Sequence, residues 1–200
     1  VRPILFIEGV HGDEPEGVRL ASMMQAWLAS LPSEELDALH PWLLIPCLNP
    51  DGSQALTRTN AHGVDLNRNY PSSKWQSDYQ EPRYYPGPEP ASEIEVQTVV
   101  QLVKQYRPKL IIHFHSWHPC VVYTGASGLP VAQVLSDVSG YRLTEDIGYP
   151  TPGSLSDWAY HDLGTPVICL EESNQANLDS VWPRFKPAII NILTTAAFAL

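Results

Sequence analysis

This sequence of 200 residues lacks several features that are typical of membrane-spanning and nucleic-acid-binding proteins. No uninterrupted apolar run reaches the roughly 18 residues that a membrane-spanning helix needs. Basic residues are scarce, with 12 Lys and Arg against 22 Asp and Glu, and the net charge is −10. That charge argues against nucleic acid or an anionic membrane as a partner. A globular domain remains, because 44% hydrophobic residues are enough to build a buried core.

Cysteine is scarce as well. Cys47, Cys120 and Cys169 are widely spaced and no Cys-x-x-Cys pair occurs, which argues against a structural zinc knuckle. An odd count fits a reducing compartment better than a disulfide framework. Residues 1–7 read as a strand and not as a signal peptide, because no small-residue cleavage site follows them. The unpaired cysteines are consistent with a cytoplasmic location, which we expect.

Apolar segments of two kinds alternate along the chain. Short apolar runs predict strands, and segments with helical periodicity predict helices. The predicted strands cover residues 4–8, 42–48, 110–115, 121–123 and 166–171. The predicted helices cover residues 15–31, 92–106, 131–139, 154–163 and 182–200, the second capped by Ser92 with Glu95. This order predicts an α/β fold in a single domain over residues 1–200. Its sheet should be mixed, mainly parallel and twisted, with helices on both faces.

Two segments without regular periodicity separate these elements. Asn49-Pro50-Asp51-Gly52 closes the second strand and is a strong turn signal. Residues 53–91 are rich in Pro, Gly, Asn and Tyr, and a loop of that length inside a compact domain is usually functional.

The first candidate site follows the first strand. His11 and Glu14 are three residues apart, so both can reach one ion, and imidazole and carboxylate are normal zinc ligands. In open α/β sheets, functional groups gather beyond the carboxyl ends of strands. His113 and His115 end the third strand on one side of it, and the residues alone do not decide which of them is the third ligand.

Charged residues elsewhere extend this candidate site. Arg58 and Arg68 lie in the long loop, where a guanidinium can pair with a carboxylate or stabilise an oxyanion. Glu171 ends an otherwise apolar strand, so it should be paired, bound to metal or functional. Glu172 should point to the opposite face and be solvated.

Eight segments, in chain order, resemble motifs of the zinc carboxypeptidase family of carboxypeptidase A. They are His11-Gly12-Asp13-Glu14, Asn49-Pro50-Asp51-Gly52, Arg58, Asp65-Leu66-Asn67-Arg68-Asn69, Ser92-Glu93-Ile94-Glu95, His115-Ser116-Trp117 with Tyr123, Tyr149 with Ser156-Asp157-Trp158, and residues 166–171. Each motif is modest, but eight in order make a chance match implausible.

The resemblance implies a metal site and a base. One Zn²⁺ per chain would be held by His11, Glu14 and His115, with His113 as a buried neighbour. Glu171 would be the general base that takes the proton of the attacking water and passes it to the leaving amine.

The resemblance also implies substrate contacts. Arg58 would stabilise the oxyanion, and Asn67 and Arg68 would grip a carboxylate of the substrate. Tyr149 would close over the bound substrate, and Ser156 would tune side-chain specificity.

One departure points to a branch of the family. Asp13 stands where digestive members carry Arg, and the His-Gly-Asp-Glu form and short length resemble the bacterial murein peptide amidases. Those enzymes cut the γ-D-glutamyl–diaminopimelate bond of cell-wall peptides. We therefore expect a small peptide substrate, the murein tripeptide, and no nucleic acid or membrane partner; the oligomeric state stays open.

Three other functions remain open. One is a general metallocarboxypeptidase or a deglutamylase that releases C-terminal residues. A second is a zinc deacylase of N-acyl amino acids, against which Tyr149 and the Asp157-Trp158 pair argue. A third is a binding module without activity.

Overall fold

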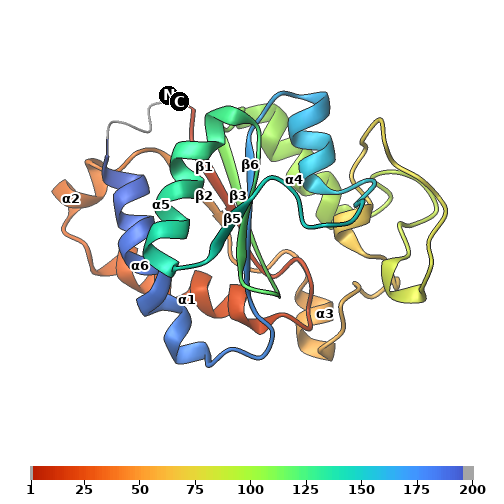
Figure 1. Cartoon of the computed structure of the whole chain (residues 1–200), viewed down its shortest axis with the longest axis horizontal. Helices are drawn as coiled ribbons and strands as arrows, with labels where there is room; N and C mark the ends of the chain where they lie inside the picture. Colours follow the sequence, from red (N-terminus) through yellow and green to blue (C-terminus); the bar gives the residue numbers. More distant parts are fainter. Residues whose placement is uncertain (1, 196–200) are drawn as a thin grey trace.

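A six-stranded sheet runs through the centre of the computed structural model, which describes residues 2–195 (Figure 1). Its strands are β1 (Ile4–Ile7), β2 (Trp42–Ile45), β3 (Leu110–Trp117), β4 (Cys120–Thr124), β5 (Arg142–Thr144) and β6 (Val167–Ser173). They lie in the order β2-β1-β3-β6-β4-β5. The first four in this order are parallel, whereas β4 is antiparallel to β6 and parallel to β5. The expected mixed, mainly parallel sheet is confirmed.

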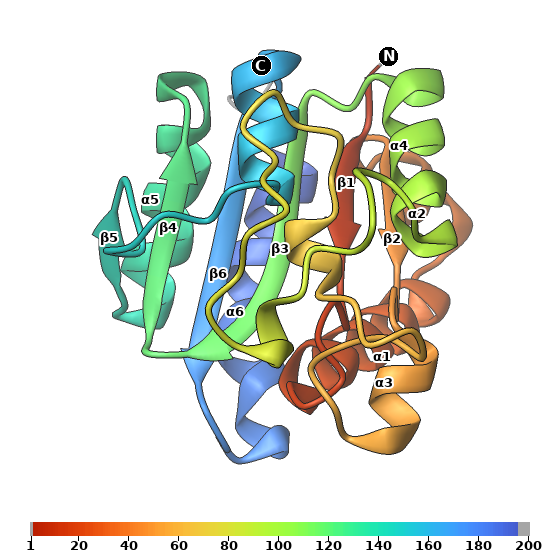
Figure 2. The same ribbon diagram turned by 90° about the vertical axis from the view of Figure 1, so that its right-hand side faces the viewer.

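Helices cover both faces of the sheet. They are α1 (Pro15–Ser30), α2 (Ser33–Asp37), α3 (Pro50–Ala55), α4 (Ile94–Tyr106), α5 (Leu129–Ser139) and α6 (Leu178–Thr194). Figures 1 and 2 show α1, α5 and α6 on one face, and α4 with the long loop on the other. None of the helices in the described part of the chain is long and apolar enough to cross a membrane.

Alternation along the strands divides the core into two clusters. In β1, Ile4 and Phe6 pack in the cluster under α1, α5 and α6, whereas Leu5 and Ile7 pack in the cluster under α4. All four side chains are at most 2% exposed, and burying each contributes roughly 1.5–3 kcal/mol. A sheet buried on both faces explains why its strands are apolar almost throughout.

The same alternation places polar side chains near the α4 face. Ile111 of β3 belongs to the cluster under α4, so His113 and His115 point to that side as well. In the parallel register, His113 faces Cys169 of β6 and His115 faces Glu171. Four polar side chains therefore gather at the carboxyl ends of two central strands.

Two local predictions need correction. Asn49 begins a short helix, α3, because its side chain accepts a hydrogen bond from Gly52 N at 2.9 Å; the segment is thus more than a turn. Helix α4 begins at Ile94 without a side-chain cap. Ser92 donates instead to the carboxylate of Glu93 at 2.7 Å, so the expected capping box is not formed.

Glu172 was expected to be solvated, and this was wrong. It is 0% exposed and receives hydrogen bonds from Tyr141 and Arg184. On the opposite face, Ile168 and Leu170 of β6 share a core cluster with Val181 and Phe185 of α6, the helix that also carries Arg184, so this face is closed to solvent.

The later elements differ from expectation mainly in their bounds. Residues 154–163 contain a π-helical segment, Asp157–Asp162. The closing helix α6 begins at Leu178 and ends at Thr194; residues 196–200, also expected in it, lie outside the described part. The short elements α2 and β5 were not predicted, because three to five residues carry too little periodicity.

The long loop is tied to the fold by a buried amide. Asn69 is 0% exposed, and its Nδ2 donates to Pro86 O at 2.7 Å and to Glu89 O at 3.0 Å. Its Oδ1 accepts from Glu93 N at the start of α4. The loop therefore has a defined path over the α4 face even though it contains little regular structure.

Candidate metal centre and substrate cavity

The loop between β1 and α1 carries the first two candidate ligands. Glu14 N donates to His11 O at 3.3 Å, and this turn brings both side chains to one side. Gly12 lies so close to α3 that a Cβ there would stand 1.9 Å from the carbonyl carbon of Gly52. Only glycine fits this approach, and the resulting contact fixes the loop against the fold.

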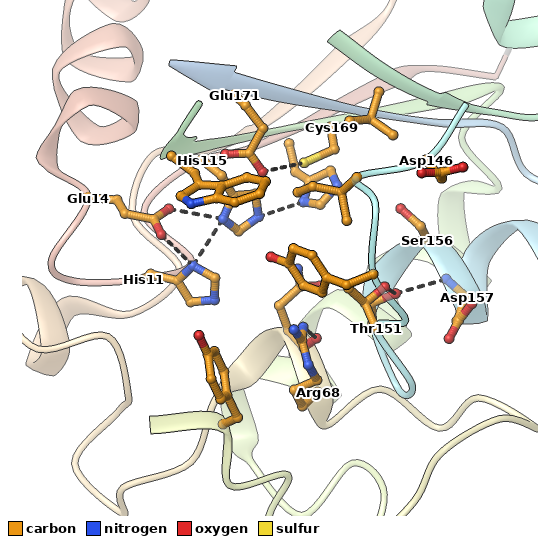
Figure 3. Close-up of a pocket in the computed structure, with 18 of the residues that line it drawn as sticks. His11, Glu14, Arg68, His115, Asp146, Thr151, Ser156, Asp157, Cys169 and Glu171 are labelled. Carbon is orange, nitrogen blue, oxygen red and sulfur yellow. Dashed lines mark hydrogen bonds and ion pairs between the residues drawn. The ribbon is translucent and has the colours of Figure 1, made fainter. Parts of the chain in front are cut away.

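Three side chains from distant parts of the chain converge in front of this loop (Figure 3). His11 Nδ1 lies 2.9 Å from Glu14 Oε1, and His115 Nδ1 lies 3.0 Å from Glu14 Oε2. The two Nδ1 atoms are 3.0 Å apart. All three residues are at most 9% exposed. Burial raises the pKa of Glu14, but the two imidazoles outweigh it and hold that pKa well below its ordinary value.

The donor set fits a zinc ion. Zinc bonds of about 2.0–2.2 Å in tetrahedral geometry place neighbouring ligand atoms roughly 3.3 Å apart, close to these separations. Hydrogen bonds alone do not satisfy the cluster of His11, Glu14 and His115. Whether the imidazoles are neutral or protonated, the three short contacts cannot all be good hydrogen bonds, because each Nδ1 atom carries either one proton or one lone pair. A cation shared by the three would satisfy every lone pair.

A second possible donor group shares one residue with the first. His113, His115 and Cys169 also have ligand atoms within 4.8 Å of one another. His115 uses its other nitrogen here, with Nε2 lying 2.9 Å from His113 Nδ1. Burial and then the neighbouring His115 lower the pKa of His113 well below its ordinary value, so it stays neutral. His113 is thus placed to orient the His115 ring while the opposite ring edge faces His11 and Glu14.

Glu171 stands beside this centre and is incompletely paired. It is 4% exposed, and burial raises its pKa. The Cys169 thiol donates to Oε1 at 3.4 Å, whereas Oε2 is buried without a hydrogen-bond partner among the described residues. A buried oxygen without a partner is available to a water or a substrate proton.

Asp65 joins the candidate ligands to Arg58, and the sequence had not assigned it a role. Its Oδ1 lies 3.1 Å from His11 Nε2, and its Oδ2 accepts from Arg58 Nε at 2.9 Å. Burial alone would raise the pKa of Asp65, but Arg58 and His11 lower it, so it is a carboxylate. Arg58 Nη1 is also 3.5 Å from Glu14 Oε1. No local sequence pattern marks this role, because His11 and Asp65 are 54 positions apart and the loop that carries Asp65 lacks periodicity.

Two predicted substrate contacts, Asn67 and Arg68, lie in a 3₁₀ turn that follows Asp65. Arg68 is only 8% exposed, and its Nη1 donates to Asn67 O at 2.8 Å. Its guanidinium lies 5.8 Å from the ring centre of Tyr84. A buried cation with so few protein partners is suited to binding an anionic group.

Apart from Asp65, which lies behind His11 and Arg58, these side chains line one cavity of about 490 Å³. Tyr149 lines it as well, half-exposed, with its ring edge-on to Trp117 at 5.6 Å. Ser156 lies at the end far from the candidate metal centre, near Asp146 (Figure 3). The structure thus brings every predicted site residue to a single cavity, although their roles remain predictions.

Residues 2–129 match the family model described as zinc carboxypeptidase. The chain belongs to the zinc carboxypeptidase family. It is therefore a metallopeptidase, and the family implies zinc, for which the cluster of His11, Glu14 and His115 offers ligands.

Relatives of this zinc carboxypeptidase include murein peptide amidase A from Escherichia coli (strain K12). That protein is 32% identical over 84% of this chain and 69% of its own length. A solved structure of murein-tripeptide amidase from Escherichia coli O157 superposes with a TM-score of 0.80. It shares 30% identity and covers 97% of this chain and 81% of its own.

More distant structures share the fold. Carboxypeptidase A from Helicoverpa armigera superposes with a TM-score of 0.73 at 17% identity, covering 94% of this chain and 60% of its own. At that identity, the comparison supports the architecture alone.

Proposed function

We propose that this zinc carboxypeptidase hydrolyses the γ-D-glutamyl–diaminopimelate bond of murein peptides, using one zinc ion per chain. The observation that carries the proposal is the convergence of His11, Glu14 and His115 beside the buried, half-paired Glu171. The relatives support the choice of substrate, since they include murein peptide amidase A and a murein-tripeptide amidase.

His11, Glu14 and His115 hold the ion in this proposal, and Asp65 fixes the His11 ring from behind. A zinc ion bound there supplies Lewis-acid polarisation of the scissile carbonyl and acidifies a water molecule. Glu171 accepts the proton of the attacking water at its free Oε2 and then delivers it to the leaving amine.

Arg58 stabilises the negative charge that develops on the carbonyl oxygen. It is held in place by Asp65 and lines the cavity beside Glu14, so its guanidinium is oriented before the substrate arrives. Such preorganised donors typically contribute about 10²–10³ in rate.

The leaving amino acid occupies the side lined by Asn67, Arg68, Tyr149 and Ser156. Arg68 and Asn67 anchor its carboxylate, and Tyr149 covers it. Ser156 and the nearby Asp146 offer a polar end to the cavity, which suits a polar side chain such as that of diaminopimelate.

A location in the cytoplasm is part of this proposal, because recycling of cell-wall fragments occurs there. The three cysteines are consistent with that compartment, since all of them are free in the described structure.

Product analysis of L-Ala-γ-D-Glu-diaminopimelate tests the proposal. The zinc-loaded protein should release free diaminopimelate, and a chelator should abolish the release until zinc is restored. Blocked dipeptides with ordinary C-terminal residues serve as the comparison. Release of those residues at a higher kcat/KM would favour a general carboxypeptidase, and no hydrolysis of either class would overturn the proposal.

A further inference from the structure

Arg83 lines the same cavity, and none of the roles above uses it. It lies in a short 3₁₀ turn, Pro82–Tyr84, of the long loop. Its Nη2 is 3.5 Å from Oδ2 of Asp13, the residue that departs from the digestive members of the family. We infer that Arg83 binds a free carboxylate on the acyl side of the scissile bond, as found in a γ-linked glutamyl residue. This inference rests on the proposed function and specifies its substrate.

Three guanidinium groups surround one aromatic ring at this place. Arg58, Arg68 and Arg83 lie 5.3, 5.8 and 5.5 Å from the ring centre of Tyr84. Such a concentration of cations is notable in a chain with only 12 Lys and Arg. Like charges repel unless anions neutralise them; Asp65, Glu14 and Asp13 neutralise part of this charge, and an anionic ligand bound at Arg68 and Arg83 would neutralise more.

The three arginines differ in the acidic partners that the protein provides for each of them. Arg58 is bound by Asp65 at 2.9 Å and approached by Glu14. Arg68 is buried and has the leaving-group carboxylate as its proposed partner. Arg83 is half-exposed and forms one long ion pair, with Asp13, among the described residues.

The contact between Arg83 and Asp13 is weak enough to be exchanged. Charge-assisted hydrogen bonds between guanidinium and carboxylate are about 2.7–2.9 Å long and often bidentate, whereas this single contact is 3.5 Å. Both side chains are substantially exposed, and such pairs contribute little to stability. A substrate carboxylate can therefore replace Asp13 as the partner of the Arg83 guanidinium at little cost in free energy. In the free enzyme, Asp13 keeps Arg83 near Arg58.

The position of Asp13 assigns Arg83 to the acyl side. Asp13 lies in the loop between His11 and Glu14, and Figure 3 shows these two at the opposite end of the cavity from Ser156. The leaving amino acid occupies the Ser156 end in the proposed function. The acyl group must then extend toward Asp13 and Arg83.

The chemistry of a γ-glutamyl bond fits this placement. In a γ-linked glutamyl residue, the α-carboxylate is free and stands three carbons from the reacting carbonyl. An ordinary α-linked peptide has no charge at that position. A cation on the acyl side would thus select γ-linked substrates by their extra carboxylate, which a neutral amide cannot replace.

Two tripeptides that differ in one group test the inference. One is L-Ala-γ-D-Glu-diaminopimelate, and the other carries an amide in place of the glutamyl α-carboxylate. The wild-type enzyme should prefer the free acid by about tenfold or more in kcat/KM, the size expected for one charge-assisted contact. Arg83→Gln should bring the ratio of the two kcat/KM values close to one, and Arg83→Lys should restore part of the preference.

Two control variants separate recognition from a purely structural role. Arg19→Gln removes a comparably exposed arginine that pairs with Asp179 far from the cavity, and it should keep the wild-type ratio. Asp13→Asn should keep or increase the ratio, because it frees Arg83 from its competing partner. If Asp13→Asn lowers the ratio as Arg83→Gln does, or if Arg83→Gln keeps the wild-type ratio, the inference is wrong. If the wild type cleaves neither tripeptide, the proposed function fails and this inference fails with it.

Discussion

Two neighbouring glutamates of β6 differ in one respect, the number of partners that the protein gives them. Glu171 points into the cavity with one weak thiol contact and a free buried oxygen. Glu172 points to the other face, where Tyr141, Arg184 and Ser173 N all bind its carboxylate. Both acids are almost fully buried, so both lose hydration on folding. The contrast indicates that the fold provides partners for its structural carboxylate and leaves that of Glu171, the proposed base, open for a substrate.

Substitution of the two histidines of β3 should give the largest effects, because one is a proposed zinc ligand and the other only its neighbour. His115→Ala should remove zinc and reduce hydrolysis below detection, since the ion would lose one of three ligands. His113→Ala should lower zinc affinity by about 10–100-fold at most, the usual effect of a residue that orients a ligand. Metal analysis after dialysis measures both. The ligand assignment would be wrong by two residues if the two variants exchanged these outcomes.

Exchange of each glutamate for its amide gives the next largest effect. Glu171→Gln should keep zinc but lower kcat by about 10²–10⁴, the range that general acid–base catalysis typically contributes. Glu172→Gln should change kcat only slightly, because its carboxylate faces away from the cavity. Steady-state kinetics with the murein tripeptide, together with zinc content, measure this. Ordinary turnover in Glu171→Gln would remove it as the base.

The same two variants should rank in the opposite order when the loss of folding stability is measured instead of the loss of kcat. Glu172→Gln should lower the free energy of unfolding by about 1–3 kcal/mol, because the amide loses the negative charge that pairs with Arg184 and puts an N–H donor where Oε2 accepts from Arg184 Nη1. Glu171→Gln should be neutral or slightly stabilising, since a neutral amide avoids burying an incompletely paired charge. Urea denaturation of the zinc-free proteins measures both. Equal losses in the two variants would show that pairing does not distinguish these acids.

The contrast between 171 and 172 also shows how far the sequence could lead. Apolar runs and helical periodicity were sufficient to predict five of the six strands and four of the flanking helices, because both signals reflect burial directly. The prediction for Glu172 failed because alternation along a strand says only that two residues face opposite ways. It does not say whether the second face meets water, and in this sheet residues of α6 pack on that face.

The residues of the site also divide into those that the sequence could predict and those that it could not. The candidate ligands and Glu171 were predicted because they lie near or just beyond the carboxyl ends of strands, where the fold concentrates polar groups. Asp65 and the pair of Asp13 with Arg83 were missed as functional partners. Their contacts join residues 54 and 70 positions apart through a loop without periodicity, and no local pattern records such pairs.

Glu93 carries a third buried carboxylate, and its substitution should give the smallest loss of stability. It also extends the comparison to the pH dependence of stability. It belongs with Glu172, because Ser92, Asn60 and His62 all bind it and so join the long loop to α4. Burial alone would raise the pKa of Glu93, but these hydrogen bonds outweigh it and the pKa is lowered. At neutral pH, Glu93→Gln should cost about 0.5–1.5 kcal/mol of stability.

The pH dependence of that loss follows from the sign of the shift. A carboxylate whose pKa is lower in the folded state stabilises the fold above its unfolded value of about 4.3, and this contribution is lost as pH falls through the folded-state pKa. The difference in stability between the wild type and Glu93→Gln should therefore shrink below about pH 4. Unfolding midpoints measured from pH 7 to pH 3 would show it. A difference that stayed constant over this range would mean that the charge of Glu93 contributes nothing, and that it belongs with Glu171 rather than with Glu172.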